Sequence, residues 1–350
     1  MKKYYTRVCN FHYGSNSKNL VKKKKALPLN SNLEISFDHI EILSRNNSKL
    51  ISIKEIKNLP LQLKKKVNKD LRIIAKRKKN FSNLNFKNLP NIMGVLNLTP
   101  DSFSDGGKYN STTKALRHAK NLINSGCDII DIGSESTRPG SKPVNEKREW
   151  QRMMQPLKAI RKLNKFISID TRKTYVMKKA LKYKVNLIND ISGLKFDNET
   201  LSFLKQSKLP FVIHHSKGDP SIMQDKPIYS NVLLDIYDFF ENKINELRSF
   251  GIKHNNILLD PGIGFGKNLK HNITILKNIS IFHSLGLPLL LGTSKKRFIK
   301  EIAKNNDTIN RHGGTISSNL FLMSQGVQVL RIHDVNEINQ GIGVYKSLVE

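Results

Sequence analysis

The sequence is poor in cysteine and in long apolar runs, and each shortage excludes a class of protein. Only Cys9 and Cys127 occur among 350 residues, so neither a disulfide framework nor a cysteine-ligated metal site is expected, and a reducing compartment is indicated. The longest apolar runs are strand-sized and fall far short of the roughly 20 residues that span a bilayer. The N-terminus, MKKYYTRVCNFHYGSN, lacks the apolar core of a secretory signal. We therefore expect a cytoplasmic protein that does not enter a membrane.

Acidic residues are also scarce. The chain has 28 Asp and Glu against 60 Lys and Arg, a formal net charge of +32, which is common among proteins that bind nucleic acid. The excess is spread along the chain, because residues 1–88 hold 22 basic and 5 acidic residues and the other 262 residues hold 38 and 23. The basic residues are not interleaved with aromatic ones as on a nucleic-acid platform. A general bias toward Lys explains the charge as well, so nucleic acid is not expected as the main partner.

Residues 1–88 differ in pattern from the rest and are predicted to form a Lys-rich extension or small subdomain of unknown function. The alternation in LEISFDHIEIL (33–43) predicts a hairpin strand. Residues 59–80 are typical of one amphipathic helix. The basic runs KKKK (22–25) and KRKK (76–79) are expected on the solvated surface.

From residue 89 to residue 350 the pattern becomes a regular rhythm of short apolar runs separated by helix-like stretches. Near-continuous apolar runs suit strands that are buried on both faces of a parallel sheet. Eight such runs in about 260 residues predict an α/β fold, a (β/α)₈ TIM barrel, in preference to an open doubly wound sheet. The runs are 91–99, 127–137, 166–171, 186–192, 210–215, 257–262, 288–294 and 327–334. Three of the intervening helices are expected at 111–126, 229–251 and 313–326.

Every predicted strand ends in groups that can bind or react. In a parallel barrel these ends meet at one face, where the active site lies. Taken singly, each residue has an ordinary structural explanation, such as a helix cap or a turn, but eight coincidences at the same end favour a shared polar site. The residues are Asn97, Asp131, Glu135, Arg138, Asp170, Asn189, Asp190, His214, His215, Asp260, Ser294, Lys295, Lys296, Arg331, His333 and Asp334.

One half of this site has the chemistry of a heterocycle pocket. The buried carboxylates of Asp170 and Asp260 need hydrogen-bond donors, and a flat ring rich in N–H groups supplies them. Asn189 adds a donor and an acceptor, and Lys296 adds a cation. These residues together suit an amino-substituted ring that carries a lactam.

The other half has the chemistry of an anion site. Arg138, Arg331 and His333 are anion binders. Asn97 offers an oxygen ligand suited to Mg²⁺ bridging phosphate groups. The segment GIGFGK (262–267) lacks the spacing of a P-loop, and is expected to be a tight loop that brings Phe265 and Lys267 to the mouth of the site.

Several long motifs resemble those of one known family, dihydropteroate synthase. MGVLNLTPDSFSDGG (93–107) and DIIDIGSESTRPGS (128–141) look like its two signature segments. Five further segments match its later motifs in order, and the resemblance runs from residue 91 to the C-terminus. These segments are SIDT (168–171), INDISG (188–193), LLDPGIGFGK (258–267), GTSKKRFI (292–299) and RIHDV (331–335).

The resemblance implies a reaction and a set of residue roles. The family joins 6-hydroxymethyl-7,8-dihydropterin diphosphate to 4-aminobenzoate, releases diphosphate, and is a sulfonamide target. By analogy, the pterin would be bound by Asp170, Asn189, Asp260 and Lys296, the metal Mg²⁺ by Asn97, the diphosphate by Arg138, Arg331 and His333, and the aminobenzoate by Thr137, Pro139, Phe265 and Arg297. Asp101 joins Asn97, Arg138, Asp170, Lys296, Arg331 and His333 in the predicted catalytic set. A homodimer is also implied.

The chain departs from the family pattern at four positions. Lys295 stands where Arg is usual, His214 where Met is common, Lys217 where Gln or Arg is common, and Arg297 where Ser is frequent. These differences concern the pocket wall and the carboxylate end of the aminobenzoate. They leave the expected reaction, an SN1-like loss of diphosphate, unchanged.

Two other functions compete with this interpretation. A methyltetrahydrofolate-dependent methyltransferase on the same barrel would share the pterin carboxylates but would not need the diphosphate-binding residues. A basic RNA-binding protein on a degenerate barrel would have lost site residues, and none is lost here.

Overall fold

The predicted barrel strands all form in the computed structural model. The structure describes residues 3–78, 84–86, 89–99, 108–136, 143–217, 227–304 and 311–349, and the side chains of residues 108–111 are left aside. The eight apolar runs become parallel strands, which confirms the predicted α/β barrel. They are β5 (Asn91–Asn97), β6 (Ile129–Gly133), β7 (Phe166–Asp170), β8 (Leu187–Asp190), β9 (Phe211–His214), β10 (Ile257–Asp260), β11 (Leu290–Leu291) and β12 (Val329–Ile332).

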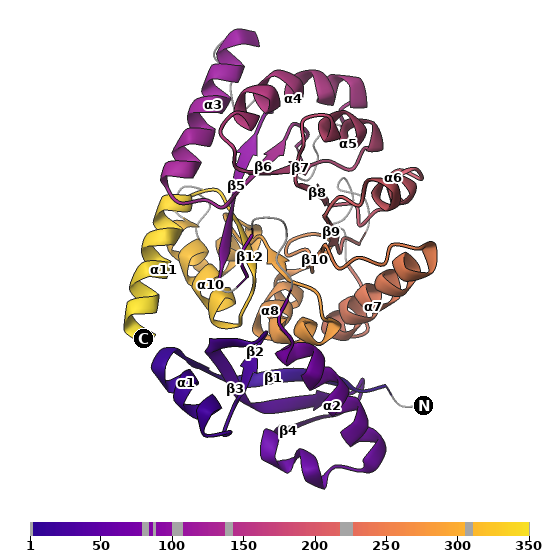
Figure 1. The fold of residues 1–350 in the computed structure, drawn as a ribbon, viewed down its shortest axis with the longest axis vertical. Coiled ribbons are helices and arrows are strands. Elements are labelled where there is room, and N and C mark those ends of the chain that lie inside the picture. Colours follow the sequence, from indigo (N-terminus) through magenta and orange to yellow (C-terminus); the bar gives the residue numbers. More distant parts are fainter. Residues whose placement is uncertain are drawn as a thin grey trace.

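These strands close on themselves (Figure 1). The hydrogen-bonded order runs from β10 down to β5 and on through β12 to β11, and a parallel bridge between Leu259 and Leu289 joins the two outer strands. An open doubly wound sheet would have left two free edges. The first inward-facing residues of neighbouring strands do not always pair with each other. At four junctions between strands the pairing is shifted by two residues; for example, Leu187 of β8 pairs with Ser168 of β7, two residues after Phe166. The total shift of eight residues is that of a (β/α)₈ barrel.

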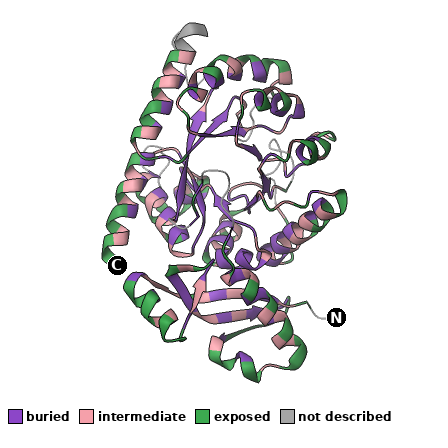
Figure 2. Ribbon diagram, viewed as in Figure 1, coloured by how far each residue is buried: buried purple, intermediate pink, exposed green. Residues whose placement is uncertain are grey.

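Helices connect the strands and cover the outside of the barrel. Figure 2 shows the strands buried and the outer faces of the helices exposed. The helix predicted at 229–251 begins later, because the Asn231 side chain caps it by accepting a hydrogen bond from the Leu234 amide, and Gly251 ends it at φ 97°. The helices are α3 (Lys108–Asn124), α4 (Glu146–Arg161), α5 (Thr174–Leu181), α6 (Thr200–Ser207), α7 (Val232–Phe250), α8 (Leu269–Lys277), η3 (Ile279–Leu285), α9 (Arg297–Ala303), α10 (His312–Ser324) and α11 (Val335–Val349). Within the described residues, none is long and apolar enough to cross a membrane.

The N-terminal region forms an antiparallel sheet with its own helices. The elements are β1 (Tyr5–Tyr13), α1 (Gly14–Lys22), β2 (Leu27–Leu29), β3 (Asn32–Leu43), β4 (Ser48–Ser52), η1 (Ile53–Asn58) and α2 (Leu61–Ala75). The predicted strand at 33–43 is β3, which pairs with all three other strands of this sheet. The predicted helix at 59–80 is α2, which ends five residues earlier than expected.

This sheet packs against the end of the barrel at which the strands begin. Each barrel strand contributes one inward apolar side chain there, and Phe37 and Ile40 of β3 belong to the same buried cluster. Figure 1 shows the N-terminal sheet lying across the barrel at this end. The extension therefore closes the barrel floor. The eight inward side chains are Met93, Ile129, Phe166, Leu187, Val212, Leu258, Leu290 and Val329.

Charged contacts at the edge of this interface join the N-terminal region to α7. Lys3 Nζ lies 2.6 Å from a carboxylate oxygen of Asp238, and the Tyr5 hydroxyl donates to the same carboxylate at 3.0 Å. Arg45 contacts Asp238 at 2.6 Å and Asp235 at 2.5 Å. Lys3, Tyr5 and Arg45 of the extension thus all contact acidic side chains of α7.

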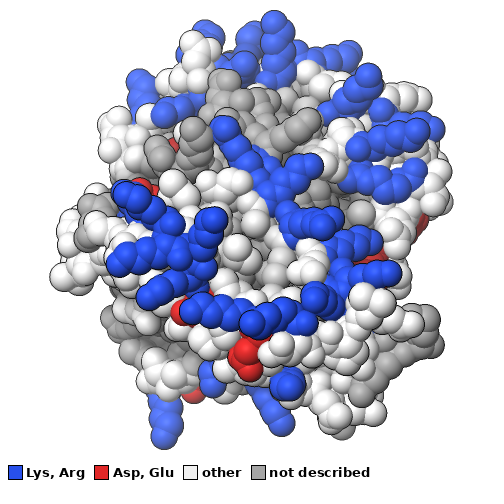
Figure 3. All heavy atoms as spheres, turned by 60° about the horizontal axis from the view of Figure 1, so that its bottom comes forward, with Lys and Arg blue, Asp and Glu red and all other residues white. Residues whose placement is uncertain are grey.

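Most of the remaining basic residues of the extension are on the surface. Figure 3 turns this end of the molecule forward and shows Lys and Arg side chains crowded over it, with few acidic ones. The run at 22–25 is exposed as predicted. The prediction for 76–79 was wrong at Lys78, which is 6% exposed and directs its ammonium at the Ile73 carbonyl. Burial lowers the pKa of Lys78 to about 8, and Lys79 lies outside the described residues.

Candidate active site

The site follows from the alternation of side chains along the barrel strands. Because successive side chains point to opposite faces of a strand, the residue two positions after each floor residue points inward again. The floor is apolar in all eight strands, but the next ring is mostly polar. Its members are Val95, Asp131, Ser168, Asn189, His214, Asp260, Gly292 and Arg331. The barrel interior therefore changes from apolar to polar within two residues, at the depth where a ligand would enter.

Arg331 links the carboxylates at the centre of this ring. Its Nε donates to Asp131 at 2.7 Å and its Nη2 donates to Asp170 at 2.9 Å. The Asn189 amide donates to the same Asp131 oxygen at 3.2 Å. On the neighbouring strand Gly133 pairs with Asp170, and a Cβ at Gly133 would lie 3.3 Å from that of Asp170. Glycine at position 133 therefore leaves room for the carboxylate.

Charge in this network is partly compensated inside the barrel. Burial raises the pKa of Asp170, while the neighbouring Arg331 lowers it and Asp131 raises it further. Burial alone would lower the pKa of Arg331, but Asp131 and Asp170 raise it above its usual value. Arg331 stays protonated, so its two carboxylate partners are held by charge-assisted hydrogen bonds. The sequence analysis placed Asp131 in the shared polar site but assigned it no specific role in binding or catalysis.

A second group of side chains stands opposite this network. Asp260 accepts a hydrogen bond from the Gly262 amide at 2.8 Å, and Lys296 places Nζ 4.2 Å from the centre of the Phe265 ring. Burial raises the pKa of Asp260 to about 6 and lowers the pKa of Lys296 to about 8. A small pocket between the two groups is lined by Asp170, Asn189, Ile191, His214, Asp260, Ile263, Phe265, Gly292, Lys296 and Arg331. All four predicted pterin-binding residues line it.

The GIGFGK loop partly meets its prediction. Phe265 lines the pocket as expected. Lys267 does not reach the mouth, because it is 2% exposed and donates to the Phe265 carbonyl at 2.9 Å, the His215 carbonyl at 3.3 Å and the His215 ring at 3.0 Å. The correction has a physical reason, since an ammonium that satisfies two carbonyls can be buried as a brace for its own loop. Gly262 has φ 69°, and a Cβ there would lie 2.0 Å from the His215 carbonyl oxygen.

The remaining predicted residues lie around this pocket or outside it. His333 bonds through Nδ1 to the Ser294 hydroxyl at 3.0 Å, and burial lowers its pKa to about 3, so the ring is neutral. Asn97 ends β5. Arg297 does not line the pocket, and its side chain is 70% exposed and paired with Glu301 at 2.6 Å. Asp101, Thr137, Arg138 and Pro139 lie outside the described residues.

Two of the positions that depart from the family pattern are engaged in contacts of their own. Lys295 Nζ lies 2.9 Å from Asp334. Lys217 donates to the Ile228 carbonyl and lies over the Tyr229 ring.

A buried ionic network that sequence reasoning missed anchors the segment after β6. Glu149 is fully buried, and it pairs with Lys173 and accepts a hydrogen bond from the Thr171 hydroxyl at 2.6 Å. Lys173 also contacts Glu135 at 2.8 Å, and Glu135 accepts from the Val144 amide at 2.9 Å. The two ends of the connection between β6 and α4 are therefore tied together. Lys173 and Glu149 end no strand, so the pattern of polar strand ends could not reveal them.

Asn97, at the end of β5, is a described residue that could contribute to holding a metal ion. Among the described residues no three His, Cys, Asp or Glu side chains come together as a metal site. Asn97 supplies a single amide oxygen beside the polar end of the barrel. Mg²⁺ commonly binds through few protein ligands and keeps water and phosphate oxygens for the rest, and one Asn oxygen is compatible with that.

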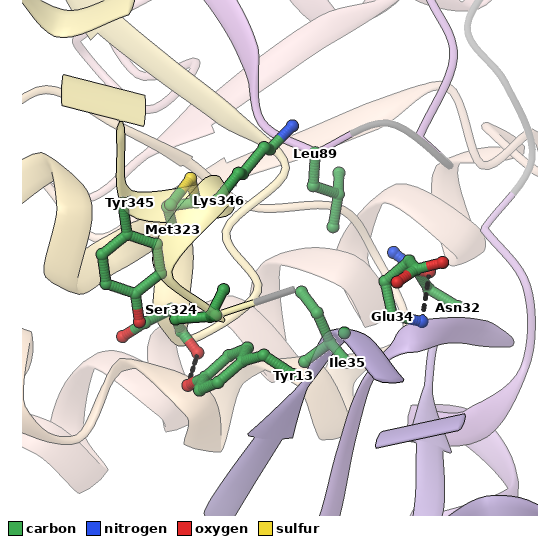
Figure 4. A pocket seen from close by; sticks show the side chains of 11 residues that line it. Tyr13, Asn32, Glu34, Ile35, Leu89, Met323, Ser324, Tyr345 and Lys346 are labelled. Carbon is green, nitrogen blue, oxygen red and sulfur yellow. Dashed lines mark hydrogen bonds between the residues drawn. The ribbon is translucent and has the colours of Figure 1, made fainter. Parts of the chain in front are cut away.

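A further cavity of about 270 Å³ lies between the N-terminal sheet and the last two helices (Figure 4). Ile35, Leu89 and Met323 are among the side chains that line it, and the Tyr13 hydroxyl donates to the Ser324 carbonyl at its edge at 2.6 Å. None of the predicted site residues lines this cavity. The polar pocket inside the barrel is thus the candidate active site.

Comparisons with known proteins agree with this geometry. The family model described as pterin binding enzyme matches residues 93–333. The dihydropteroate synthase of Escherichia coli K12 is 39% identical over 259 residues, which is 74% of this chain and 91% of that relative. The chain belongs to the dihydropteroate synthases. The structure of Yersinia pestis dihydropteroate synthase with a sulfonamide drug superposes with a TM-score of 0.71 at 37% identity, covering 76% of this chain and 96% of that one.

A second solved dihydropteroate synthase, from Xanthomonas albilineans with 4-aminobenzoic acid, gives a TM-score of 0.70 at 32% identity and covers 75% of this chain and 93% of that one. The resemblance predicted from motifs is thereby confirmed. Less than a tenth of each of these relatives lies outside the aligned part. The family match begins at residue 93, so the N-terminal sheet is an addition to the part of the barrel that these dihydropteroate synthases share.

Proposed function

We propose that this dihydropteroate synthase joins 6-hydroxymethyl-7,8-dihydropterin diphosphate to 4-aminobenzoate, forming 7,8-dihydropteroate and releasing diphosphate. The observation that carries the proposal is the polar ring at one end of the barrel, where Asp170, Asn189, Asp260 and Lys296 surround one pocket. The division of the chain into an extension (1–88) and a catalytic barrel (89–350) is part of the proposal.

The pterin would occupy the pocket between Asp170 and Asp260. The amino-substituted pterin ring carries N–H donors along one edge, and carboxylate and amide oxygens are the acceptors that such donors need. Asn189 can both donate and accept, which suits the lactam group. Lys296 would approach the ring while its ammonium stays over Phe265.

The diphosphate would be held at the rim of the same pocket. Arg331 uses Nε and Nη2 for Asp131 and Asp170, and Nη1 has no partner among the described residues. We infer that Nη1 contacts a phosphate oxygen. Because His333 is neutral, it would donate one hydrogen bond from its ring N–H and would contribute no positive charge. Arg138 is proposed as the third diphosphate ligand, and Thr137 and Pro139 with Phe265 as neighbours of the aminobenzoate.

Asn97 would contribute a ligand to Mg²⁺ bound with the diphosphate. Bound there, the metal supplies charge neutralisation for the leaving group. The residues of this chain provide the rest of the chemistry. As the bond between the pterin methylene and diphosphate oxygen breaks, Asp170 and Asp260 face the positive charge that develops on the ring.

The arylamine nitrogen then forms the new C–N bond with its lone pair and loses one proton to water. That nitrogen is already neutral at pH 7, so this step needs no strong general base. The described residues around the pocket accordingly supply charge and position.

The test is release of diphosphate by the full chain with pterin diphosphate, 4-aminobenzoate and Mg²⁺. We expect stoichiometric release and formation of 7,8-dihydropteroate, both of which need the aminobenzoate. A folded protein that binds methyltetrahydrofolate and transfers its methyl group, but releases no diphosphate, would refute the proposal in favour of the methyltransferase. The homodimer and the cytoplasmic location remain predictions, which sedimentation and fractionation would check.

A further inference from the structure

His214 stands inside the pocket with hydrogen-bonding capacity that the proposed chemistry has not used. It ends β9, where its backbone pairs with Asp260 of β10, and both side chains line the pocket. The residue is 2% exposed. Its ring packs edge-on against Phe265 with centroids 4.6 Å apart, at an interplanar angle of 86°. The imidazole is therefore fixed in orientation by its strand and by Phe265.

The imidazole is neutral and lacks a full set of partners. Burial lowers the pKa of His214 well below its usual value, and the neighbouring cations Lys267 and Lys296 lower it further. Nδ1 is buried and has no hydrogen-bond partner among the described residues. A neutral imidazole carries one N–H and one lone pair. In the tautomer with the proton on Nδ1, Nε2 is left as an acceptor.

The distance from Nε2 to Asp260 Oδ2 is 4.0 Å. That separation is too long for a hydrogen bond between the two atoms. It is the right width for one N–H donor group between them, because a nitrogen about 2.9 Å from each acceptor spans this gap. An amino group has two hydrogens and can donate to both.

From this arrangement we propose that His214 is a specificity-determining residue of the heterocycle subsite. Its Nε2 and Asp260 Oδ2 together accept hydrogen bonds from one amino group, or from adjacent N–H groups, of the bound ring. Ligands that lack this amino group leave Nε2 unpaired and are rejected. The inference rests on the proposed function, since it concerns the same pterin pocket.

The experiment compares two ligands across three forms of the full-length protein. The ligands are 6-hydroxymethyl-7,8-dihydropterin diphosphate and its analogue without the exocyclic amino group, and the proteins are the wild type, His214→Leu and His214→Gln. Calorimetry gives Kd for each pair, so binding is measured apart from turnover. His214→Leu removes the acceptor at similar volume, and His214→Gln restores a polar atom. The matched control is His254→Leu, which removes a histidine that contacts Phe211 at the opposite end of β9.

We expect His214→Leu to weaken binding of the amino-bearing ligand about tenfold and to change binding of the analogue by less than about twofold. His214→Gln should recover part of the loss, and His254→Leu should leave both values unchanged. If His214→Leu weakened binding of both ligands equally, His214 would only fill space in the pocket wall. If the variant changed the Kd of neither ligand, the proposal would likewise be wrong. Either result leaves the proposed function standing, whereas a wild-type protein that binds no pterin diphosphate would refute that function first.

Discussion

The two ends of the barrel are built from the same strands but have opposite chemistry. At the end where the strands begin, eight apolar side chains form one buried cluster with the N-terminal sheet. Two residues further along each strand, the interior carries Asp131, Asn189, Asp260 and Arg331. The closed end is held by burial of apolar surface, and the open end holds charges that pair with each other or accept hydrogen bonds from neutral groups, as Asp260 does from the Gly262 amide.

The difference indicates that apolar packing at one end stabilises the fold, whereas the polar end serves binding. Buried charges add little net stability, because their desolvation offsets much of their attraction. The stability of the barrel must therefore come from its buried apolar clusters, of which the closed end is one and the layer between the strands and the surrounding helices is another. The polar end is suited to binding, since ions held in fixed positions in a low-dielectric interior act strongly on a ligand. Changes at the two ends should then affect different measurements.

The largest effect is expected from deletion of residues 1–88. Removal of the N-terminal sheet would expose the floor residues of the barrel, including Met93 and Phe166, and an apolar patch of this kind promotes aggregation. We expect the truncated chain to lose most of its soluble yield, measured by expression and size-exclusion chromatography beside the full chain. A soluble, monodisperse barrel with full activity would show that packing of the extension on the floor does not stabilise the barrel.

Asp170→Asn should affect activity and leave the fold intact. The substitution keeps the shape of the side chain but removes the charge that faces Arg331. We expect kcat/KM for pterin diphosphate to fall roughly 100- to 1,000-fold, with the melting temperature changed by less than about 4 °C.

The matched change at the closed end is Phe37→Ala. Phe37 is fully buried in the floor cluster, so the variant should lose about 3–5 kcal/mol of stability. It should keep kcat/KM per folded molecule at low temperature. If both variants lost activity and stability together, the proposed separation of the two ends would be wrong.

The sequence predicted the barrel well because its signal is periodic. Eight apolar runs of strand length, each ending in polar groups, identified the strands and the end at which Asp170, Asn189, Asp260 and Lys296 meet. The N-terminal sheet was mostly missed. β1 mixes polar and apolar residues and includes Asn10 at φ 53°, so its alternation of polar and apolar residues is weak. Its pairing with β3 is a long-range contact, which the local sequence does not reveal.

The prediction for Lys267 was wrong because its contact depends on how the loop folds in three dimensions, whereas the role of Arg297 stays a prediction. Lys267 sits in a glycine-rich loop that pointed to the pocket mouth, yet its ammonium turns inward to the His215 and Phe265 carbonyls. Arg297 follows Lys296 directly but extends into solvent toward Glu301. Adjacent residues at a helix start point in different directions, which the spacing in the sequence does not reveal.

A pH profile would sharpen the description of the polar end. Asp260 has a pKa of about 6 and Lys296 a pKa of about 8. Pterin binding needs the carboxylate ionised and the ammonium protonated. Burial also raises the pKa of Asp170, to about 7, and its carboxylate has to be ionised as well. Affinity should therefore be highest between about 7 and 8, fall as the pH drops through the pKa values of Asp170 and Asp260 and fall again as it rises above about 8. The ligand for this measurement is 6-hydroxymethyl-7,8-dihydropterin without diphosphate, so that titration of the phosphates does not interfere.

Lys296→Arg separates the two limbs of that profile. A guanidinium remains protonated throughout the range, so the alkaline fall should disappear while the acid fall persists. Loss of both limbs would mean that neither Asp170 nor Asp260 is the group that titrates on the acid side.

The smallest effect is expected at the charged edge of the closed end. Asp238→Asn removes the carboxylate shared by Lys3, Tyr5 and Arg45. Because these side chains are partly exposed, the loss should be about 1 kcal/mol, seen as a fall of about 1–2 °C in the melting temperature at low salt. In 1 M salt, where the screening length is about 3 Å, the difference should shrink toward zero. Glu246→Gln is the control, since the partner of Glu246 among the described residues is Lys243 of its own helix. An equal fall in both variants would mean that α7 itself, and not its contact with the extension, has been weakened.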